Sequence, residues 1–274
     1  MSMPLLCPTC EGALSWGDHA CLCPQGHSFD LAKEGYVNLL LSHCRRSKHP
    51  GDDANMVQAR RRIFDHGAFS PLTELIKEEV CRQMSGPSNI LDAGCGEGHF
   101  LGALGKVLTG SLFGIDVSKD AVRNAARRHP GVRWIVANIM RRLPFADDSL
   151  DVILSVLAPR NAKDFARVLK TGGALVIVVP GPQHLVELRS RLMAHAGDYE
   201  KKGAEAIEAC APHFVDQHKS ELTYELSADQ AVLNDLIQMT PLFWRSTQSA
   251  KSKVQELDGL KITMNFVLLI LHPA

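Results

Sequence analysis

The sequence has no long apolar run, no secretory signal and no excess of charge of one sign. Its 274 residues contain no window close to the roughly 18 apolar residues that a membrane-spanning helix needs, so we expect a soluble protein. The N-terminus, MSMPLLCPTC, lacks a basic stretch followed by an apolar run, so we predict a cytoplasmic location. The 30 basic and 30 acidic residues give a formal net charge of zero, so only the distribution of charge can point to a charged partner.

Cysteine is sparse outside one short stretch. Four of the eight cysteines fall between positions 7 and 23, and the others are scattered singly at Cys44, Cys81, Cys95 and Cys210. In a reducing compartment isolated cysteines are most often small buried residues, so we expect no disulfides. The clustered cysteines need another explanation.

The N-terminal stretch CPTCEGALSWGDHACLCPQGH has the spacing of a zinc site. Cys7 and Cys10 form a CxxC pair, and Cys23 and His27 follow at a spacing typical of zinc ribbons. Cys21 is an alternative to Cys23, but CPQGH repeats the Cys-Pro turn of CPTC and therefore favours Cys23. We predict a closed, structural zinc site, because this segment has too few apolar residues to fold alone. A contact with nucleic acid and a purely stabilising role are both compatible with such a head.

Two segments of the neutral chain are basic. Residues 31–62 hold seven Lys or Arg against three acids, and residues 119–142 hold seven against Asp120 alone. The first segment includes the turn-rich loop SHCRRSKHPGDD, with Arg45, Arg46 and Lys48. Together the two segments could form a phosphate-binding face, although a pair of solvated surfaces is the simpler explanation of the charge alone.

From about residue 88 onward, short apolar runs alternate with helical patterns. This alternation predicts parallel strands joined by crossover helices, which is an α/β fold with a doubly wound sheet. Five runs, from NILDAGC to ALVIVVP, alternate with helices, and ELTYEL and KITMNFVLLIL add two final strands, one of which can be antiparallel. The sequence therefore predicts a mostly parallel, seven-stranded sheet.

Capping signals mark several helix boundaries. Ser70-Pro71 offers a side-chain acceptor at the cap and a proline where its missing N–H costs nothing, so a helix is predicted to start there. Further helices are predicted from Gln183 to about His195 and from about Ser227 to Gln238. We divide the chain into a zinc-binding head (1–45), a basic linker (46–69) and a main domain (70–274).

The first predicted strand of the main domain leads into a glycine loop, LDAGCGEGHF, at residues 91–100. Gly94, Gly96 and Gly98 allow a ligand to approach main-chain amides at the switch point of the sheet. A dinucleotide-binding GxGxxG fingerprint would place glycine or alanine at position 99, where His99 stands. Asp116, at the end of the second strand, is placed to accept hydrogen bonds from both ribose hydroxyls of a nucleotide.

The spacing from Asp92 through the three glycines resembles the first motif of class I S-adenosylmethionine-dependent methyltransferases. RLPFADDSLDVI and FARVLKTGG resemble the same family, with Thr171 where proline is usual. The resemblance implies S-adenosylmethionine as the cofactor and places Asn138 where these enzymes read the adenine edge.

Motifs in the head and in the main domain together indicate one group within this family. CPTC to CPQGHSFDLAKEGYVNLL, PGDDANMVQARRRIFDHGAFSPL, LDAGCGEGHF, PGPQHLVEL and QMTPLFW occur in this order. They resemble, across nearly the whole chain, the bacterial 23S ribosomal RNA guanine-N1 methyltransferases of the RlmA type. The resemblance implies N1 methylation of a guanine in a 23S rRNA hairpin, a homodimer, and zinc on the four residues favoured by spacing.

The resemblance also implies residues that contact the cofactor. The complete predicted cofactor-binding set is Phe69, Asp92, Gly94, Gly96, Glu97, Gly98, Phe100, Leu101, Asp116, Asn138 and His184, and the predicted zinc ligands are Cys7, Cys10, Cys23 and His27. Phe69 stands where relatives can carry an aromatic residue with a hydroxyl. No catalytic residue is assigned, although Asp52, Asp53 and His184 are conceivable bases for the N1 proton.

Two other functions are compatible with parts of the sequence. The stretch from Leu143 to Gly173 looks equally like methyltransferases of quinone biosynthesis, which act on small molecules and generally lack a zinc head. A zinc-ribbon nucleic-acid-binding protein without catalysis is the second, but the intact glycine loop with Asp92 and Asp116 argues against it. We favour the hypothesis that the zinc head and the basic loop grip an RNA hairpin while the main domain carries the cofactor.

Overall fold

The computed structural model describes residues 5–41, 54–192, 199–240, 247, 252, 254 and 257–274. A small antiparallel sheet forms the N-terminal head, in the order β1 (Ser15–Trp16), β2 (Ala20–Leu22) and β3 (Ser28–Asp30). Arg45, Arg46, Lys48, Asp52, Asp53 and Cys44 lie outside the described residues, as do the end of the helix predicted to reach His195 and residues 241–244 of QMTPLFW.

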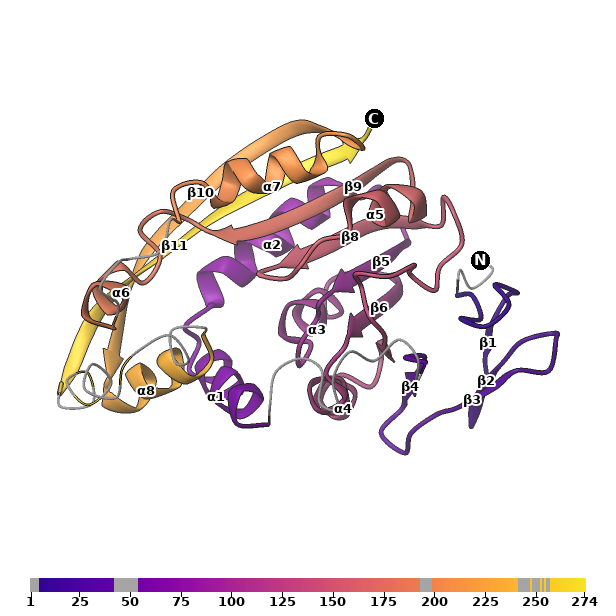
Figure 1. The fold of residues 1–274 in the computed structure, drawn as a ribbon, viewed down its shortest axis with the longest axis horizontal. Helices are drawn as coiled ribbons and strands as arrows, with labels where there is room; N and C mark the ends of the chain where they lie inside the picture. The colour runs from indigo at the N-terminus through magenta and orange to yellow at the C-terminus, as the bar shows by residue number, and fades with distance from the viewer. Residues whose placement is uncertain are drawn as a thin grey trace.

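A larger, mixed sheet forms the body of the protein (Figure 1). Its strand order is β10 (Phe214–Asp229), β11 (Gly259–Pro273), β9 (Leu169–Pro180), β8 (Leu150–Val156), β5 (Ser88–Ala93), β6 (Gly110–Asp116), β7 (Arg133–Val136) and β4 (Tyr36–Asn38). β11 runs antiparallel to both of its neighbours, and the pairs from β9 to β4 are parallel. The predicted α/β class with a doubly wound, mostly parallel sheet is confirmed.

The sheet has eight strands, where the sequence predicted seven. The additional strand is β4, which belongs to the segment predicted as the head and pairs in parallel with β7 through Tyr36↔Trp134 to Asn38↔Val136. Its three residues are too short to read as a strand from sequence, and its partner lies nearly a hundred positions away. The head segment therefore extends the edge of the main sheet.

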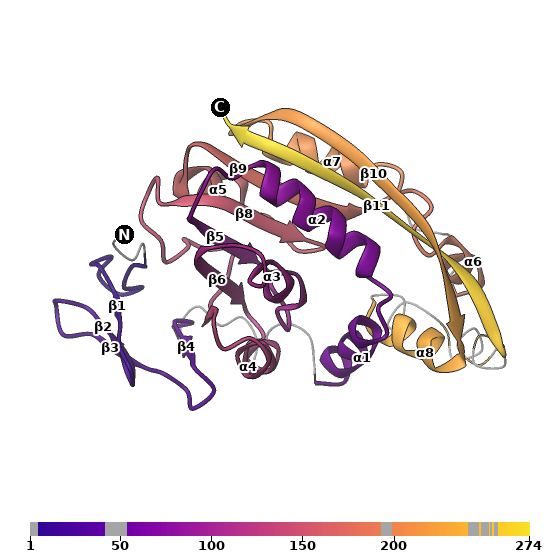
Figure 2. The same ribbon diagram turned by 180° about the vertical axis from the view of Figure 1, so that it is seen from behind.

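Helices cover both faces of the sheet. They are α1 (Ala54–Asp65), α2 (Ser70–Arg82), α3 (His99–Leu104), α4 (Lys119–Arg128), α5 (Ala162–Val168), α6 (Val186–Leu192), α7 (Lys202–Cys210) and α8 (Gln230–Gln238). One face packs against α2, α3, α4, α6 and α8, with α2 in front of the strands in Figure 2. The other face packs against α5, α7 and the head.

Side chains alternate along the strands between these two cores. In β5, Ile90 belongs to the core under α2 and α3, whereas Leu91 and Ala93 belong to the core shared with the head. Both faces of a parallel sheet are buried in this way, which explains why its strands read as nearly continuous apolar runs.

Three predicted helix starts differ from the structure. α6 begins at Val186 instead of Gln183, because residues 182–185 form a turn in which Leu185 has a left-handed backbone with φ of +53°. Ser70 is the first helical residue of α2 instead of its cap, because Phe69 occupies the cap position and makes no side-chain capping bond. The last helix begins at Gln230 instead of near Ser227, because β10 continues to Asp229, whose carboxylate then accepts a hydrogen bond from the Val232 N–H. Strand pairing with β11 overrides the earlier helical pattern there.

The head is joined to the body by several contacts. Leu5 bridges Phe145, and the Leu6 N–H donates to the Pro144 carbonyl at 2.8 Å. Arg127 of α4 pairs with Glu34 of the head at 2.7 Å, and burial of this carboxyl opposes, but does not cancel, the lowering of its pKa by Arg127. Together these contacts hold the head against α4 and against the segment between β7 and β8.

Within the described residues, none of the helices combines the length and the apolar character needed to cross a lipid bilayer.

Candidate functional site

The glycine loop leaves the carboxyl end of β5 and turns against β6. The amide groups of Gly94 and Cys95 both donate to the Ile115 carbonyl, at 2.8 and 3.0 Å. Gly98 adopts a left-handed backbone with φ of +79°, and a Cβ at this position would overlap the ring of Trp134. A Cβ on Gly94 would lie 2.5 Å from the Cβ of Ala158, in the loop after β8. The loop is therefore packed tightly between β7 and the end of β8.

A cavity of about 740 Å³ opens beside this loop. Its size lies within the roughly 300–1,000 Å³ range of small-molecule pockets. Most of its lining is apolar, and the carboxyl groups of Asp92, Glu97 and Asp116 lie together at the end formed by the glycine loop. This position, outside the carboxyl ends of the central strands, is where open α/β sheets bind ligands.

The three carboxyl groups give this end of the cavity an acidic character. Asp116 accepts hydrogen bonds from the backbone amides of Gly96 and Ser118, at 3.0 and 2.8 Å, so its orientation is fixed. Asp92 is almost completely buried, and among the described residues its Oδ2 atom has no hydrogen-bond partner. Burial and the nearby Asp116 raise the pKa of Asp92 to about 7. Such a group favours a positively charged ligand.

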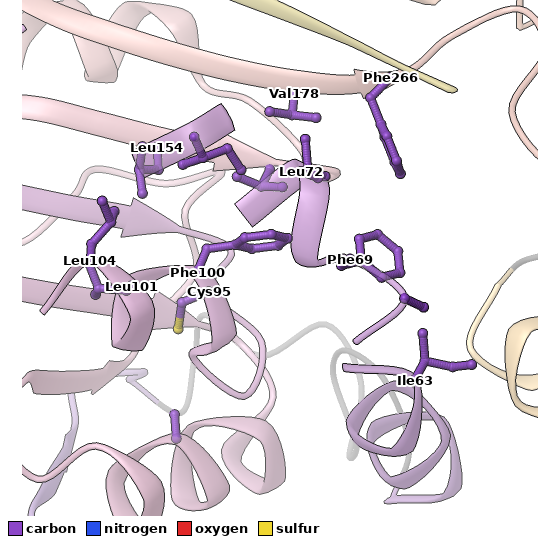
Figure 3. Packing of buried hydrophobic residues seen from close by; sticks show 14 of the residues in the cluster. Ile63, Phe69, Leu72, Cys95, Phe100, Leu101, Leu104, Leu154, Val178 and Phe266 are labelled. Carbon is purple, nitrogen blue, oxygen red and sulfur yellow. The ribbon is translucent and has the colours of Figure 1, made fainter. Parts of the chain in front are cut away.

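An aromatic wall lies along another side of the cavity, and Figure 3 shows three of its side chains, Phe69, Phe100 and Phe266. The ring of Phe69 lies 6.5 Å from that of Phe100 and 5.7 Å from that of Phe266. Phe64 of α1 stacks on His99 at 4.0 Å, and the His99 ring also contacts Thr73 through a 3.0 Å hydrogen bond. The wall thus joins α1, α3 and β11 around the glycine loop.

His184 lies in the same cavity as a neutral imidazole. Burial, together with Arg189, lowers its pKa to about 3. Its Nδ1 atom accepts a hydrogen bond from the Asn265 N–H at 3.4 Å, which assigns the proton to Nε2. His184 is therefore a poor proton acceptor at neutral pH, and its ring lies 4.6 Å from that of Phe266.

Asn138 follows β7 and lies between two cavities. It lines the large cavity and also a smaller one of about 360 Å³, between the head and the loop after β7. Its Oδ1 atom accepts a hydrogen bond from the Met140 N–H at 2.9 Å, which leaves its amide N–H groups to donate elsewhere. Arg141 and Arg142 line the smaller cavity.

The four side chains predicted as zinc ligands converge in the head. The ligand atoms of Cys7, Cys10, Cys23 and His27 all lie within 4.8 Å of one another. Cys10 Sγ is 3.7 Å from Cys23 Sγ, and Cys23 Sγ is 3.3 Å from His27 Nδ1. A tetrahedron with Zn–S bonds of about 2.3 Å separates its sulfur atoms by about 3.8 Å, so the cluster fits zinc.

Cys21 lies outside this cluster. It pairs with Trp16 and Phe29 across the small sheet and is fully buried, which raises its pKa to about 11. A thiol that is hard to ionise is a poor metal ligand.

Sequence comparisons agree with both parts of this arrangement. Residues 5–48 match the family model described as "RlmA, N-terminal", a zinc ribbon, and residues 90–173 match the model described as "Methyltransferase domain". The 23S rRNA (guanine(748)-N(1))-methyltransferase of Streptomyces fradiae is 34% identical over 98% of this chain and 96% of its own. YxjB of Bacillus subtilis (strain 168), provisionally named for guanine-N(1) methylation of 23S rRNA, is 34% identical over 96% of this chain and 95% of its own.

The chain belongs to the RlmA-type family of 23S rRNA (guanine-N1-)-methyltransferases.

Solved structures agree with the fold of this RlmA-type protein. A chain of the complex between the Haloferax volcanii Trm112 methyltransferase activator and a methyltransferase superposes with a TM-score of 0.51 and 20% identity. The match covers 81% of this chain and 98% of the other. The shared feature is the class I methyltransferase fold.

The structure brings most of the predicted cofactor-binding residues of this RlmA-type chain together. Nine of the eleven line the large cavity, namely Phe69, Asp92, Gly94, Gly96, Glu97, Phe100, Asp116, Asn138 and His184. Gly98 and Leu101 do not line it: Gly98 shapes the turn against Trp134, and Leu101 is fully buried in the core.

Other lining residues of this RlmA-type cavity were not predicted from sequence. Met56, Arg60 and Phe64 come from α1, within the segment predicted as a linker, and a Cβ on Gly96 would lie 3.3 Å from Arg60 Nη1. Arg60 and Phe64 are one helical turn apart, so they share a face of α1, but no local motif marked that face as part of a cofactor site. The boundaries at residues 45 and 69 remain predictions.

The second basic segment is largely neutralised within the protein. Arg123 pairs with Asp120, Arg127 with Glu34 and Arg128 with Asp65, each at 2.7 Å or less. Arg127 joins α4 to the head, and Arg128 joins it to α1. Charge counting along the sequence could not separate them from arginines that are available to a phosphate.

Proposed function

We propose that this chain transfers the methyl group of S-adenosylmethionine to N1 of a guanine in a hairpin of 23S ribosomal RNA. The observation that carries the proposal is the continuous similarity to guanine-N(1) methyltransferases across both the zinc ribbon and the methyltransferase domain. The fold adds a cavity at the glycine loop and a head held beside it. S-adenosylmethionine supplies an electrophilic methyl carbon on a sulfonium centre.

The cofactor site is assigned to the large cavity. The backbone of Gly94 and Gly96 and the carboxylates of Asp92 and Asp116 fit a nucleoside that carries positive charge. We assign the ribose hydroxyls to Asp116, the adenine edge to Asn138 and the apolar faces to Phe69 and Phe100. Glu97 and His184 complete the predicted set within the cavity, and Gly98 and Leu101 support the loop from behind it.

The carboxylate end of the cofactor is assigned to Arg60. The zwitterionic methionine end requires a cation as well as carboxylates, and Arg60 Nη1 reaches the surface of the loop at Gly96. The guanidinium comes from α1, so the helix that follows the basic loop takes part in the cofactor site.

The zinc site is assigned to Cys7, Cys10, Cys23 and His27. The sulfur–sulfur and sulfur–nitrogen distances support a closed structural site. The ion would hold together a head whose own sheet has three strands of two or three residues each.

The chemistry needs positioning more than acid–base groups. Holding the acceptor nitrogen in line with the methyl carbon at near-attack distance removes most of the entropic barrier. His184 has too low a pKa to accept the N1 proton at neutral pH. The apolar lining excludes competing water, which leaves acceptor placement and charge stabilisation as the main contributions of the protein.

The RNA partner is assigned to the side of the protein that carries the head. A guanine inside a hairpin must leave its stack before its N1 atom can enter a cavity, and structured RNA is read largely through shape and backbone. Arg141 and Arg142 line the smaller cavity between the head and the loop after β7. Arg142 pairs there with Glu11 of the head at 3.2 Å, so Arg141 is the one that suits a phosphate. Pairing of two copies into a homodimer and a cytoplasmic location remain predictions.

The test is to map N1-methylguanine in 23S rRNA from cells with and without this protein. N1 methylation blocks base pairing, so it stops reverse transcription and identifies the nucleotide. We expect one stop that depends on the protein, and purified protein with S-adenosylmethionine should restore it on rRNA from the deficient cells. The same map decides whether the site is guanine 748, as in the Streptomyces fradiae relative. An identical pattern in both strains, with no methyl transfer in vitro, would refute the proposal.

A further inference from the structure

The large cavity extends beyond the glycine loop to a region that the cofactor assignments leave unused. Its lining there comes from the loop after β8 and from the segment leading into α7, and we call it the acceptor end. It consists of Leu157, Pro159, Arg160, Tyr199 and Lys202. The acceptor end adjoins the glycine loop directly, because Ala158 packs against Gly94.

Leu157 shows two features of a functional position. Its backbone is left-handed, with φ of +54°, which is strained for a bulky residue, and its amide is held by the Val178 carbonyl at 2.9 Å. Its side chain is 43% exposed although it borders an apolar cavity. The fold thus fixes an apolar side chain at the mouth of the cavity, where a flat ring could pack against it.

Arg160 is the cation of the acceptor end for which the part of the chain that the structure describes offers no acidic partner. Among the described residues no carboxylate lies within salt-bridge distance of its guanidinium, whereas Lys202 pairs with Glu205 at 2.9 Å. Its Nη1 atom donates to the Ala158 carbonyl at 3.2 Å, which places the guanidinium close to the glycine loop. Burial lowers its pKa, and Cys210 and Glu205 of α7 oppose that shift. A half-buried guanidinium without a counter-charge is suited to an electron-rich ligand.

We propose that Arg160 reads the O6 and N7 atoms of the target guanine at the acceptor end. This inference rests on the proposed function. A bidentate contact from arginine to O6 and N7 is the commonest specific contact between proteins and guanine. O6 and N7 lie on the Hoogsteen edge of guanine, whereas N1 lies on the Watson–Crick edge. An arginine on the first edge therefore leaves N1 open toward the glycine loop. Adenine would present an amino donor at position 6 to the same donors, so Arg160 selects against it.

The contact also stabilises charge that develops during transfer. In the net reaction the N1–C bond forms, the C–S bond breaks with its electron pair remaining on sulfur, and the N1 proton is released to water. As this proton leaves, negative charge spreads from N1 to O6. A guanidinium already aimed at O6 stabilises that charge without rearrangement.

The experiment combines variants with base analogues. A hairpin transcript carries guanine, inosine, 7-deazaguanine or adenine at the mapped position, and initial rates are measured with labelled S-adenosylmethionine. Wild-type protein should methylate inosine as fast as guanine. It should methylate 7-deazaguanine about fivefold more slowly, because the hydrogen bond to N7 is lost, and it should not methylate adenine. Arg160→Met should lower kcat/KM on guanine by about 10- to 100-fold, with a smaller additional loss on 7-deazaguanine.

Controls separate this role from a structural one. Arg82→Met removes an exposed arginine of α2 that pairs with Glu79, and it should leave all rates unchanged. Binding of S-adenosylhomocysteine and the melting temperature should be the same in Arg160→Met and wild type. The optimum for the variant should move to higher pH, because the N1 proton becomes harder to lose.

The failures of the two proposals are distinguishable. If wild-type protein methylates no RNA, the proposed function is wrong. If wild-type protein methylates guanine and 7-deazaguanine equally fast, or if Arg160→Met keeps full activity on guanine, only the role of Arg160 is wrong. The analogue comparison on wild-type protein decides the matter even if the variant fails to fold.

Discussion

Asp92 illustrates how one buried residue can link stability, pH and ligand charge. Its carboxyl is surrounded by the glycine loop and lies near Asp116, and burial followed by that neighbour raises its pKa to about 7. In the unfolded chain the same group ionises near pH 4. Unfolding therefore releases a proton between about pH 4 and pH 7, and the stability of the fold should fall as the pH rises through this range.

Asp92→Asn should remove this dependence. At about pH 3, below the pKa of this carboxyl in both the unfolded and the folded state, its side chain is largely neutral in both states, so the free energies of unfolding of variant and wild type should be similar. At pH 8 wild type carries a buried charge, and the variant should be the more stable of the two, while binding S-adenosylmethionine more weakly. Urea unfolding at both pH values provides the measurement. If the free energies of unfolding of the two proteins differed by the same amount at both pH values, the stability would not depend on the ionisation of Asp92, which would contradict this prediction.

Arg60→Met tests the assignment of the methionine carboxylate. The variant should lose affinity for S-adenosylhomocysteine by about 10- to 100-fold, since a hydrogen bond to a charged group contributes about 1.5–3 kcal/mol. It should bind methylthioadenosine, which lacks that carboxylate, as wild type does. Arg61→Met, which removes the neighbouring surface arginine paired with Asp65, is the matched control. Calorimetry with both ligands makes the comparison, and equal losses for the two ligands would refute the assignment.

At the same scale, local signals in the sequence identified the residues that lie on the glycine loop. Asp92 and the three glycines form a contiguous motif, and Asp116 ends an apolar run, so a short window contains the information. Arg60 and Arg160 are single polar residues in ordinary helical or loop contexts. Their role depends on which elements the fold brings together, and this cannot be read from neighbouring residues.

At the scale of the element, the turn after β5 depends on glycine for two separable reasons. Gly98 and Gly172 both have φ of +79°, so both carry the backbone strain that a side chain would bring. Only Gly98 faces a neighbour, the ring of Trp134, whereas a Cβ on Gly172 would meet nothing within 4 Å. Substitutions at these two glycines therefore separate the cost of backbone strain from the cost of steric overlap.

Gly172→Ala should cost about 1 kcal/mol of stability, the usual cost of a left-handed non-glycine residue. Gly98→Ala should cost about 3 kcal/mol, because displacement of the buried Trp134 adds to the strain. It should also weaken cofactor binding, since the loop moves with the ring. Denaturant unfolding of both variants, with S-adenosylhomocysteine titrations, checks this. Equal costs for the two substitutions would show that overlap with Trp134 is unimportant.

Elements also differ in how far the sequence determined them. The strands from β5 to β9 were predictable because both faces are buried and their apolar runs are long. β4 was missed because three residues carry too little pattern, and its strand character comes from pairing with β7. The start of α8 was displaced because the long pairing of β10 with β11 extended the strand to Asp229.

At the scale of the whole molecule, the head and the body share a core. Leu5, Leu14, Cys7 and Cys23 belong to the same apolar cluster as the strands β5 and β6. The other cluster, under α2 and α3, takes Tyr36 and Leu40 from the segment after β3, but among the described residues it contains none of β1, β2, β3 or the four predicted zinc ligands. Loss of the metal should therefore disorganise the head and loosen one face of the sheet, while the face that carries the aromatic wall is preserved.

Removal of zinc tests this division and the ligand set together. Cys23→Ala should lower the zinc content and abolish methylation of the RNA hairpin, yet keep binding of S-adenosylhomocysteine within a few-fold of wild type, because the glycine loop packs on the opposite core. Cys21→Ala, a matched change two residues away and outside the cluster, should keep its zinc and its activity with a modest loss of stability. Metal analysis and hydrogen exchange of the two variants make the measurement. Zinc loss in Cys21→Ala with retention in Cys23→Ala would reverse the ligand assignment, and simultaneous loss of cofactor binding would show that the two cores unfold as one.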